Sequence, residues 1–85
     1  MSGILMVESS SSHIENNLIS LNLSANIAFG GKENSQNTVI LHNRIINSSN
    51  EGIVVINSGR AEIRCNVIMG NNDGIVVVGS DRVLI

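Results

Sequence analysis

The 85-residue chain is built from a repeated motif, and this repeat limits the fold more than any other feature of the sequence. Each copy begins with Gly-Ile or Asn-Ile, and the copies start 23, 26 and 22 residues apart. The four starting positions are Gly3, Asn26, Gly52 and Gly74. A second motif, Ile-x-x-Asn-x-Ile, follows in three copies, with its asparagines at Asn17, Asn43 and Asn66. Periods of about 20 to 50 residues indicate supersecondary units that stack on one another.

Each copy contains three short runs with the two-residue alternation of a strand, separated by turn residues such as Asn, Ser and Gly. The chain has no proline, and its apolar residues are mostly Ile, Val and Leu, which favour strands. We therefore predict an all-β fold, a single-stranded parallel β-helix of about three and a half coils of 22–26 residues. The whole chain, 1–85, forms one segment with coils at 3–25, 26–51, 52–73 and 74–85.

Stacking the coils predicts columns of like side chains in the core. The columns that begin with Ile4, Met6 and Ile14 recur in all three following copies, and the Ile14 column ends at Ile85. The column that begins with Ile19 recurs in the next two copies. Asn17, Asn43 and Asn66 form a polar column at a corner, which we interpret as a structural ladder. Asn tolerates a left-handed backbone, and its amide can bond to the amides above and below it.

The second copy is longer than the others, and the extra residues fall between Gly30 and Thr38. Insertions in stacked repeats protrude from one face, which is often the binding face. We therefore identify Lys32, Glu33 and Asn34 as a candidate binding loop. The alternative is loop growth without a binding role.

Composition limits the classes of partner. The net charge of −2 offers no basic face for phosphates, so we predict no nucleic-acid partner. Neither a signal peptide nor an apolar run of about 20 residues is present, so we predict no membrane association. The single cysteine, Cys65, excludes an intrachain disulfide and fits an intracellular location, in the cytoplasm or the nucleus. We also expect the chain to be an internal piece of a longer solenoid, or else to self-associate through uncapped ends.

Two pairs of residues at equal positions on adjacent coils are candidates for chemistry. Glu51 and Asp73 could together hold a hard cation, although solvated turn residues are the simpler interpretation. His42 and Cys65 could form an activated thiolate with Asn16 below, although small side chains beside a corner would look the same. Other acids do not recur at one position of the repeat. We therefore predict no enzymatic activity, no catalytic residue, no metal and no cofactor.

The stretch GIVVINSGRAEIRCNVIMGNNDGIVVV resembles the right-handed β-helix repeats of carbohydrate-binding proteins and sugar hydrolases, the pectate-lyase-like fold. Its pattern is most similar to the β-helical segment of F-box proteins, which select substrates for ubiquitin ligases. This resemblance implies a right-handed coil and a non-catalytic scaffold that recruits a protein. The alternative is part of a polysaccharide lyase, hydrolase or epimerase whose catalytic coils lie elsewhere. A protein partner is favoured over a carbohydrate, because aromatic platforms for sugars are missing and Phe29 falls in an inward column.

Overall fold

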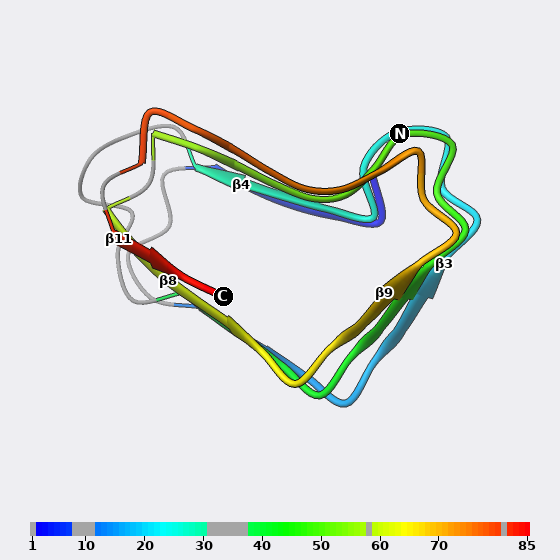
Figure 1. Ribbon diagram of the computed structural model, residues 1–85, viewed down its shortest axis with the longest axis horizontal. Helices are drawn as coiled ribbons and strands as arrows, with labels where there is room; N and C mark the ends of the chain where they lie inside the picture. Colours follow the sequence, from blue (N-terminus) through cyan, green and yellow to red (C-terminus); the bar gives the residue numbers. More distant parts are fainter. Residues whose placement is uncertain (1, 8–11, 31–37, 58, 81) are drawn as a thin grey trace.

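The protein is a parallel β-helix. The computed structural model describes residues 2–7, 12–30, 38–57, 59–80 and 82–85, and within them every regular element is a strand. Figure 1 looks along the stacked coils, which follow one another around a three-sided outline. The strands are β1 (Ile4–Val7), β2 (His13–Glu15), β3 (Leu18–Ser20), β4 (Ile27–Gly30), β5 (Thr38–Leu41), β6 (Arg44–Ile46), β7 (Glu51–Ile56), β8 (Arg60–Arg64), β9 (Val67–Met69), β10 (Asp73–Val78) and β11 (Arg82–Leu84).

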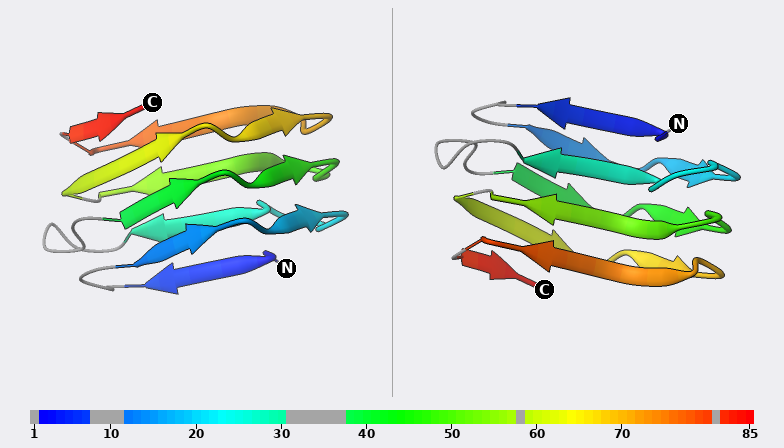
Figure 2. Two further views of the ribbon diagram at one scale, coloured as in Figure 1. Left: turned by 90° about the horizontal axis from the view of Figure 1, so that it is seen from below. Right: turned by 90° about the horizontal axis from the view of Figure 1, so that it is seen from above.

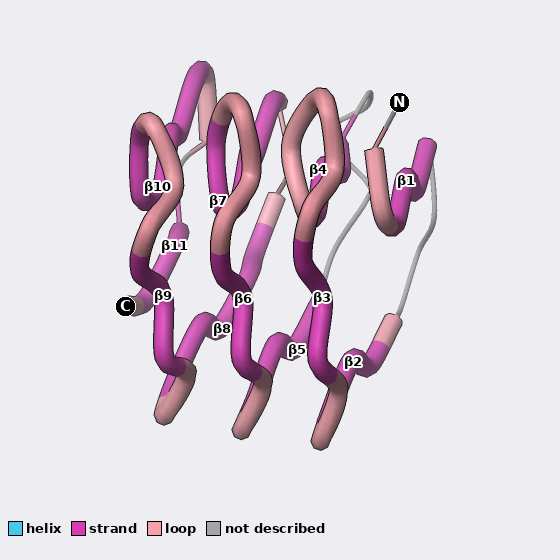
Figure 3. The backbone as a smooth tube through the Cα atoms, turned by 90° about the vertical axis from the view of Figure 1, so that its right-hand side faces the viewer, coloured by secondary structure: helices cyan, strands magenta, loops and turns pink. Residues whose placement is uncertain are grey.

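The strands form three parallel sheets, one for each side of the outline. The first sheet has the order β1-β4-β7-β10, the second β2-β5-β8-β11 and the third β3-β6-β9. Figures 2 and 3 show successive coils lying side by side, so that each strand pairs with its equivalents in neighbouring coils. The all-β parallel β-helix predicted from the repeat is confirmed.

The register of the strands is the one that the repeat predicts. In the first sheet Ile4 pairs with Ile27, Ile27 with Ile53, and Ile53 with Ile75. In the other sheets the same holds for the columns Ile14–Ile40–Ile63 and Ile19–Ile45–Ile68. Side chains alternate between the two faces of a strand, so every second residue points inward. With this register the isoleucines of the three columns all point inward, one above the other.

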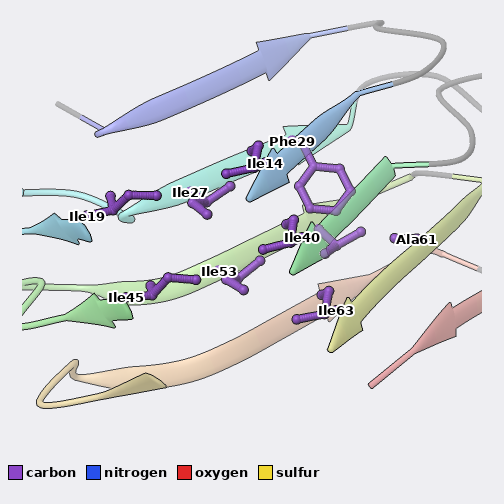
Figure 4. Close-up of a cluster of buried hydrophobic side chains, with 10 residues drawn as sticks. Ile14, Ile19, Ile27, Phe29, Ile40, Ile45, Ile53, Ala61 and Ile63 are labelled. Carbon is purple, nitrogen blue, oxygen red and sulfur yellow. The ribbon is translucent and has the colours of Figure 1, made fainter. Parts of the chain in front are cut away.

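These inward side chains make up the core, shown in Figure 4. Ile27, Ile40, Ile45 and Ile53 are completely buried, and Phe29, the one aromatic residue of the chain, is 4% exposed. Ile85 was expected in the column of Ile63, but it follows β11 and is 69% exposed. The buried part of that column therefore comprises Ile14, Ile40 and Ile63.

The corners use left-handed backbone conformations, but not where the sequence predicted them. We expected the left-handed residues to be the ladder asparagines, and that expectation is wrong. The left-handed residue is the one before each of them, namely Asn16, His42 and Cys65, with φ of 60°, 56° and 57°. The ladder asparagine is thereby left free to turn its amide along the stack.

A second amide network, which the sequence did not predict, fills the corner before the first sheet. Asn26 is completely buried there. Its Oδ1 accepts a hydrogen bond from Asn22 Nδ2 (2.6 Å), and its Nδ2 donates to Asn71 Oδ1 (3.1 Å) and to the carbonyl of Ile46 (3.1 Å). Nearby, Ser48 donates its hydroxyl hydrogen to the carbonyl of Ser24. The signal for this network was present in the sequence, since Asn26 stands where the other three copies have glycine.

Candidate functional site

The ladder asparagines bond to one another from coil to coil. Asn43 Oδ1 accepts hydrogen bonds from the backbone N–H and the side-chain amide of Asn17, at 2.9 and 3.2 Å. Asn66 Oδ1 accepts the same two bonds from Asn43, at 2.8 and 3.1 Å. Asn43 is only 2% exposed, and its amide also donates to the carbonyl of Ile14 at 2.9 Å. These hydrogen bonds join the corners of three successive coils, as expected of a structural ladder.

The candidate binding loop, Lys32, Glu33 and Asn34, lies outside the described residues. The two residues that flank it are described, and both belong to strands. Gly30 is the last residue of β4, and Thr38 is the first residue of β5. The loop therefore connects the first sheet to the second sheet at the Gly30 end of β4.

His42 and Cys65 lie in equivalent positions, as the repeat predicts, because the preceding Leu41 and Arg64 are register partners. Both side chains are exposed, and no hydrogen bond joins them. The left-handed backbone at both residues belongs to the same corner as Asn16. This geometry supplies a turn but no third group that would orient a histidine toward a thiol.

The left-handed corner predicts that Cys65→Asn stabilises the protein. Asn adopts this backbone conformation more readily than cysteine, and Asn16 already occupies it in the first coil. We expect a gain of about 0.5 kcal/mol in the free energy of unfolding, measured by urea titration followed by circular dichroism. Cys65→Ala, which removes the thiol without supplying that preference, is the control and should give no gain. Equal stabilisation by both variants would contradict the explanation.

The carboxylates Glu51 and Asp73 also lie where the sequence placed them. They are register partners at the first positions of β7 and β10. Among the described residues no group of three His, Cys, Asp or Glu side chains gathers in a way that would hold a metal ion. The pair is therefore an acidic point on one corner, with no third carboxylate gathered beside it in the part of the chain that the structure describes.

The outer face of the first sheet is the feature that the sequence analysis missed. The charged residues of this sheet, Glu51 and Asp73, lie at its corner, at the start of β7 and β10. The outward positions that follow them, and those paired with them in β1 and β4, carry no polar side chain. We name this surface the apolar face, and it consists of Leu5, Val7, Ala28, Gly30, Val54, Ile56, Val76 and Val78. Leu5, Val7, Ile56 and Val78 are among the large hydrophobic side chains that are exposed to solvent.

The apolar face is hollowed above β4. Ala28 and Gly30 are the smallest residues on this face, and they lie between the larger side chains of β1 and β7. The hollow has a volume of about 190 Å³, and its walls include Leu5, Val7 and Ile56. In Figure 1 the first sheet, along the top of the outline, dips between its two corners, so the face is concave.

The other two sheets differ from the apolar face because charged residues interrupt their outer surfaces. The second sheet turns His13, Glu15, Glu62 and Arg64 outward, and the third turns Arg44 outward. The signal for the apolar face was visible in the sequence as runs such as GIVVI and GIVVVG, in which both alternating positions are aliphatic. In such runs one set of side chains fills the core and the other set is left for the outer surface.

The three parallel sheets, their shared register and their amide-bonded corners define a β-solenoid. The model of one protein family, described as "Right handed beta helix region", matches residues 1–85, and the chain belongs to this family. The right-handed coil implied by the resemblance is therefore confirmed. Searches of curated proteins and of solved structures found no significant match to the chain. No helix in the described part of the chain is long and apolar enough to cross a membrane.

Proposed function

We propose that this protein is a non-catalytic recognition scaffold that binds another protein through the apolar face. The observation that carries the proposal is that the eight paired positions of the apolar face include no polar side chain. Contiguous exposed apolar surface of this kind marks interaction sites on soluble proteins. In the F-box proteins that the repeat resembles, the β-helical segment recruits substrates, and the apolar face would serve the same purpose here.

The size of the apolar face favours a narrow partner element. Four strands about 4.8 Å apart and four residues of about 3.3 Å each give a face of roughly 250 Å². A stable dimer buries about 800 Å² on each partner, so this face alone is too small for a flat contact between two copies. An amphipathic helix about 10 Å wide would cover it with about three turns. We therefore expect the occupant to be an amphipathic segment of a partner protein, seated with an apolar side chain in the hollow above Ala28 and Gly30.

An aspartate in the apolar face should strongly weaken binding of an amphipathic helix. Ile56→Asp places a charge beside the hollow, where a bound apolar segment would bury it without a partner. The probe is a fluorescently labelled helical peptide with leucines at positions i, i+3, i+4 and i+7. We expect Ile56→Asp to weaken its binding by more than about tenfold in fluorescence anisotropy.

Val67→Asp is the matched control, because Val67 is 47% exposed on the third sheet and Ile56 is 44% exposed. This control should leave peptide binding unchanged. A peptide with the same composition but scattered leucines should bind weakly to the unmodified protein. Equal binding of both peptides, or equal loss in both variants, would overturn the proposal. A concentration-dependent dimer that Ile56→Asp dissociates would instead make a second copy the occupant.

The absence of catalysis is a separate part of the proposal and has its own test. Glycoside hydrolysis requires two carboxyl groups placed on either side of a bound sugar. Glu51 and Asp73 are the carboxylates that the register brings to one position on adjacent coils. If the protein depolymerises a polysaccharide and Asp73→Ala removes that activity, the protein is a carbohydrate-active enzyme and the scaffold proposal fails.

A further inference from the structure

A pair of arginines on the second sheet forms a cationic position that has no partner within the described part of the protein. Arg60 and Arg82 are the first residues of β8 and β11, and they are register partners. Both side chains are exposed. Paired strands lie about 4.8 Å apart, and like charges placed directly opposite each other repel. This repulsion favours any anion that can lie between the two guanidinium groups.

The nearby acidic side chain is engaged elsewhere. Glu62, two residues after Arg60 on the same face of β8, lies 3.7 Å from Arg64, measured from Oε2 to Nη2. On the same face, at the opposite edge of the sheet, Glu15 lies 2.9 Å from His13, measured from Oε1 to Nε2. Neither Arg60 nor Arg82 makes an ion pair or a hydrogen bond with the described residues. Among the described residues of this surface, three arginines therefore face two glutamates, and the positive charge without an ion pair lies at the Arg60–Arg82 end.

The two arginines border a groove. A hollow of about 340 Å³ is lined by Arg60, Glu62, Arg82 and Leu84, together with the inward-facing Ala61 and Val83. A second hollow of about 130 Å³ shares Arg60 and Glu62 with it and continues to Thr38 and Val39 on β5. The groove thus crosses three strands of the second sheet and combines charged groups with aliphatic side chains.

We infer that this groove binds an acidic peptide segment, with a carboxylate held between Arg60 and Arg82. A guanidinium presents N–H groups in a fork that matches a carboxylate, and two forks on adjacent strands can share one acidic side chain. Leu84 and Val39 offer aliphatic contacts to the neighbouring residues of such a segment. An acidic polysaccharide would supply the charge as well, but its hydroxyl-rich rings suit aromatic platforms, and Phe29 is buried in the core.

The arginine groove and the apolar face lie on different sheets, so the two sites are independent. They can be tested separately, since Ile56→Asp lies outside the groove. If the apolar face proves not to bind an amphipathic helix, the groove remains to be tested on its own.

The test uses a labelled extended peptide in which glutamate alternates with valine, and a second peptide with glutamine in place of glutamate. In fluorescence anisotropy at low ionic strength we expect only the glutamate peptide to bind. Arg60→Gln and Arg82→Gln should each weaken binding by about tenfold, because each removes a hydrogen bond to a charged group. Arg44→Gln makes the same change of net charge on the exposed outer side of β6 and should have less than about a twofold effect.

A second measurement keeps the test decisive if a variant is unstable. In the unmodified protein, titration with sodium sulfate should shift the backbone amide resonances of residues 60–62 and 82–84 before others, as followed by NMR. Ile56→Asp should leave binding of the glutamate peptide unchanged. Equal loss in Arg44→Gln and Arg60→Gln, or equal binding of the glutamine peptide, would overturn the inference. So would binding of polygalacturonate that depends on Arg60 and Arg82 when the glutamate peptide does not bind.

Discussion

Gly30→Ala is expected to reduce the free energy of unfolding by more than about 4 kcal/mol, a large part of the 5–15 kcal/mol that holds a typical domain together. A Cβ atom added at Gly30 would overlap the backbone carbonyl oxygen of Ile56 and lie 2.7 Å from its carbonyl carbon. The φ angle of Gly30 is +143°, a conformation that residues with a side chain rarely adopt. The substitution is therefore strained even before the clash is counted.

The clash at Gly30 cannot be relieved by a side-chain movement. Gly30 and Ile56 are register partners in the hydrogen-bonded ladder between β4 and β7. Moving either backbone segment would break the pairing of the two central strands of the first sheet. We therefore expect urea titration followed by circular dichroism to show a greatly lowered midpoint, or a chain that is already unfolded without urea.

Gly74→Ala is the matched control for Gly30→Ala. Gly74 also lies in a strand of the first sheet, but a Cβ atom there has no neighbour within 4 Å, and its φ is not positive. Replacing a strand glycine of this kind is expected to be neutral or to stabilise by up to about 0.5 kcal/mol. A similar loss of stability in both variants would mean that the close approach to Ile56 is not what requires glycine at position 30.

The sequence predicted the fold because the residues that repeat are the ones that stack. Ile4, Ile27 and Ile53 recur at one position of the repeat and pair with one another in the first sheet. In a parallel β-helix an equal position in the sequence becomes an equal position in space, so alignment of the copies gives the register directly. The same reasoning correctly brought Glu51 beside Asp73.

The sequence was less informative about the surfaces. Alternation identifies two faces of a strand, but when both sets are aliphatic, as in Val54 and Val55, it does not say which one faces water. The pairing of Arg60 with Arg82 was overlooked for another reason. The alignment followed apolar positions, and an outward arginine column contributes nothing to the core pattern. Both candidate binding surfaces therefore emerged from the positions that the core does not use.

Two glycines of the repeat lie against an asparagine amide and against the backbone of the next coil. A Cβ atom at Gly3 would lie 2.7 Å from the Asn22 Nδ2 atom and from the Asn26 carbonyl oxygen. One at Gly52 would lie 2.7 Å from the Gly74 carbonyl oxygen and 3.0 Å from Asn71 Nδ2. The asparagine amide thus fills the space that a side chain at the start of the coil would need. The second coil reverses this arrangement, with Asn26 at the start and the smaller Ser48 at the position of Asn22 and Asn71.

This reversal predicts that Asn26→Gly lowers the free energy of unfolding by about 3 to 4 kcal/mol, because buried polar groups lose their partners. The Asn22 and Asn71 amides and the Ile46 carbonyl each lose a hydrogen bond to Asn26. Ser48→Asn alone should also destabilise, by about 1 to 3 kcal/mol, since it crowds a second amide against Asn26.

The double variant Asn26→Gly/Ser48→Asn should regain much of this loss, because it gives the second coil the pairing that the first and third coils already have. The new amide at position 48 would take the place that Asn71 holds in the next coil, where Asn71 Nδ2 donates to the Ile45 carbonyl at 2.9 Å. A double-mutant cycle in urea should therefore give a favourable coupling of at least about 2 kcal/mol between positions 26 and 48. Simple additivity of the two losses would show that the amides do not substitute for one another across this corner.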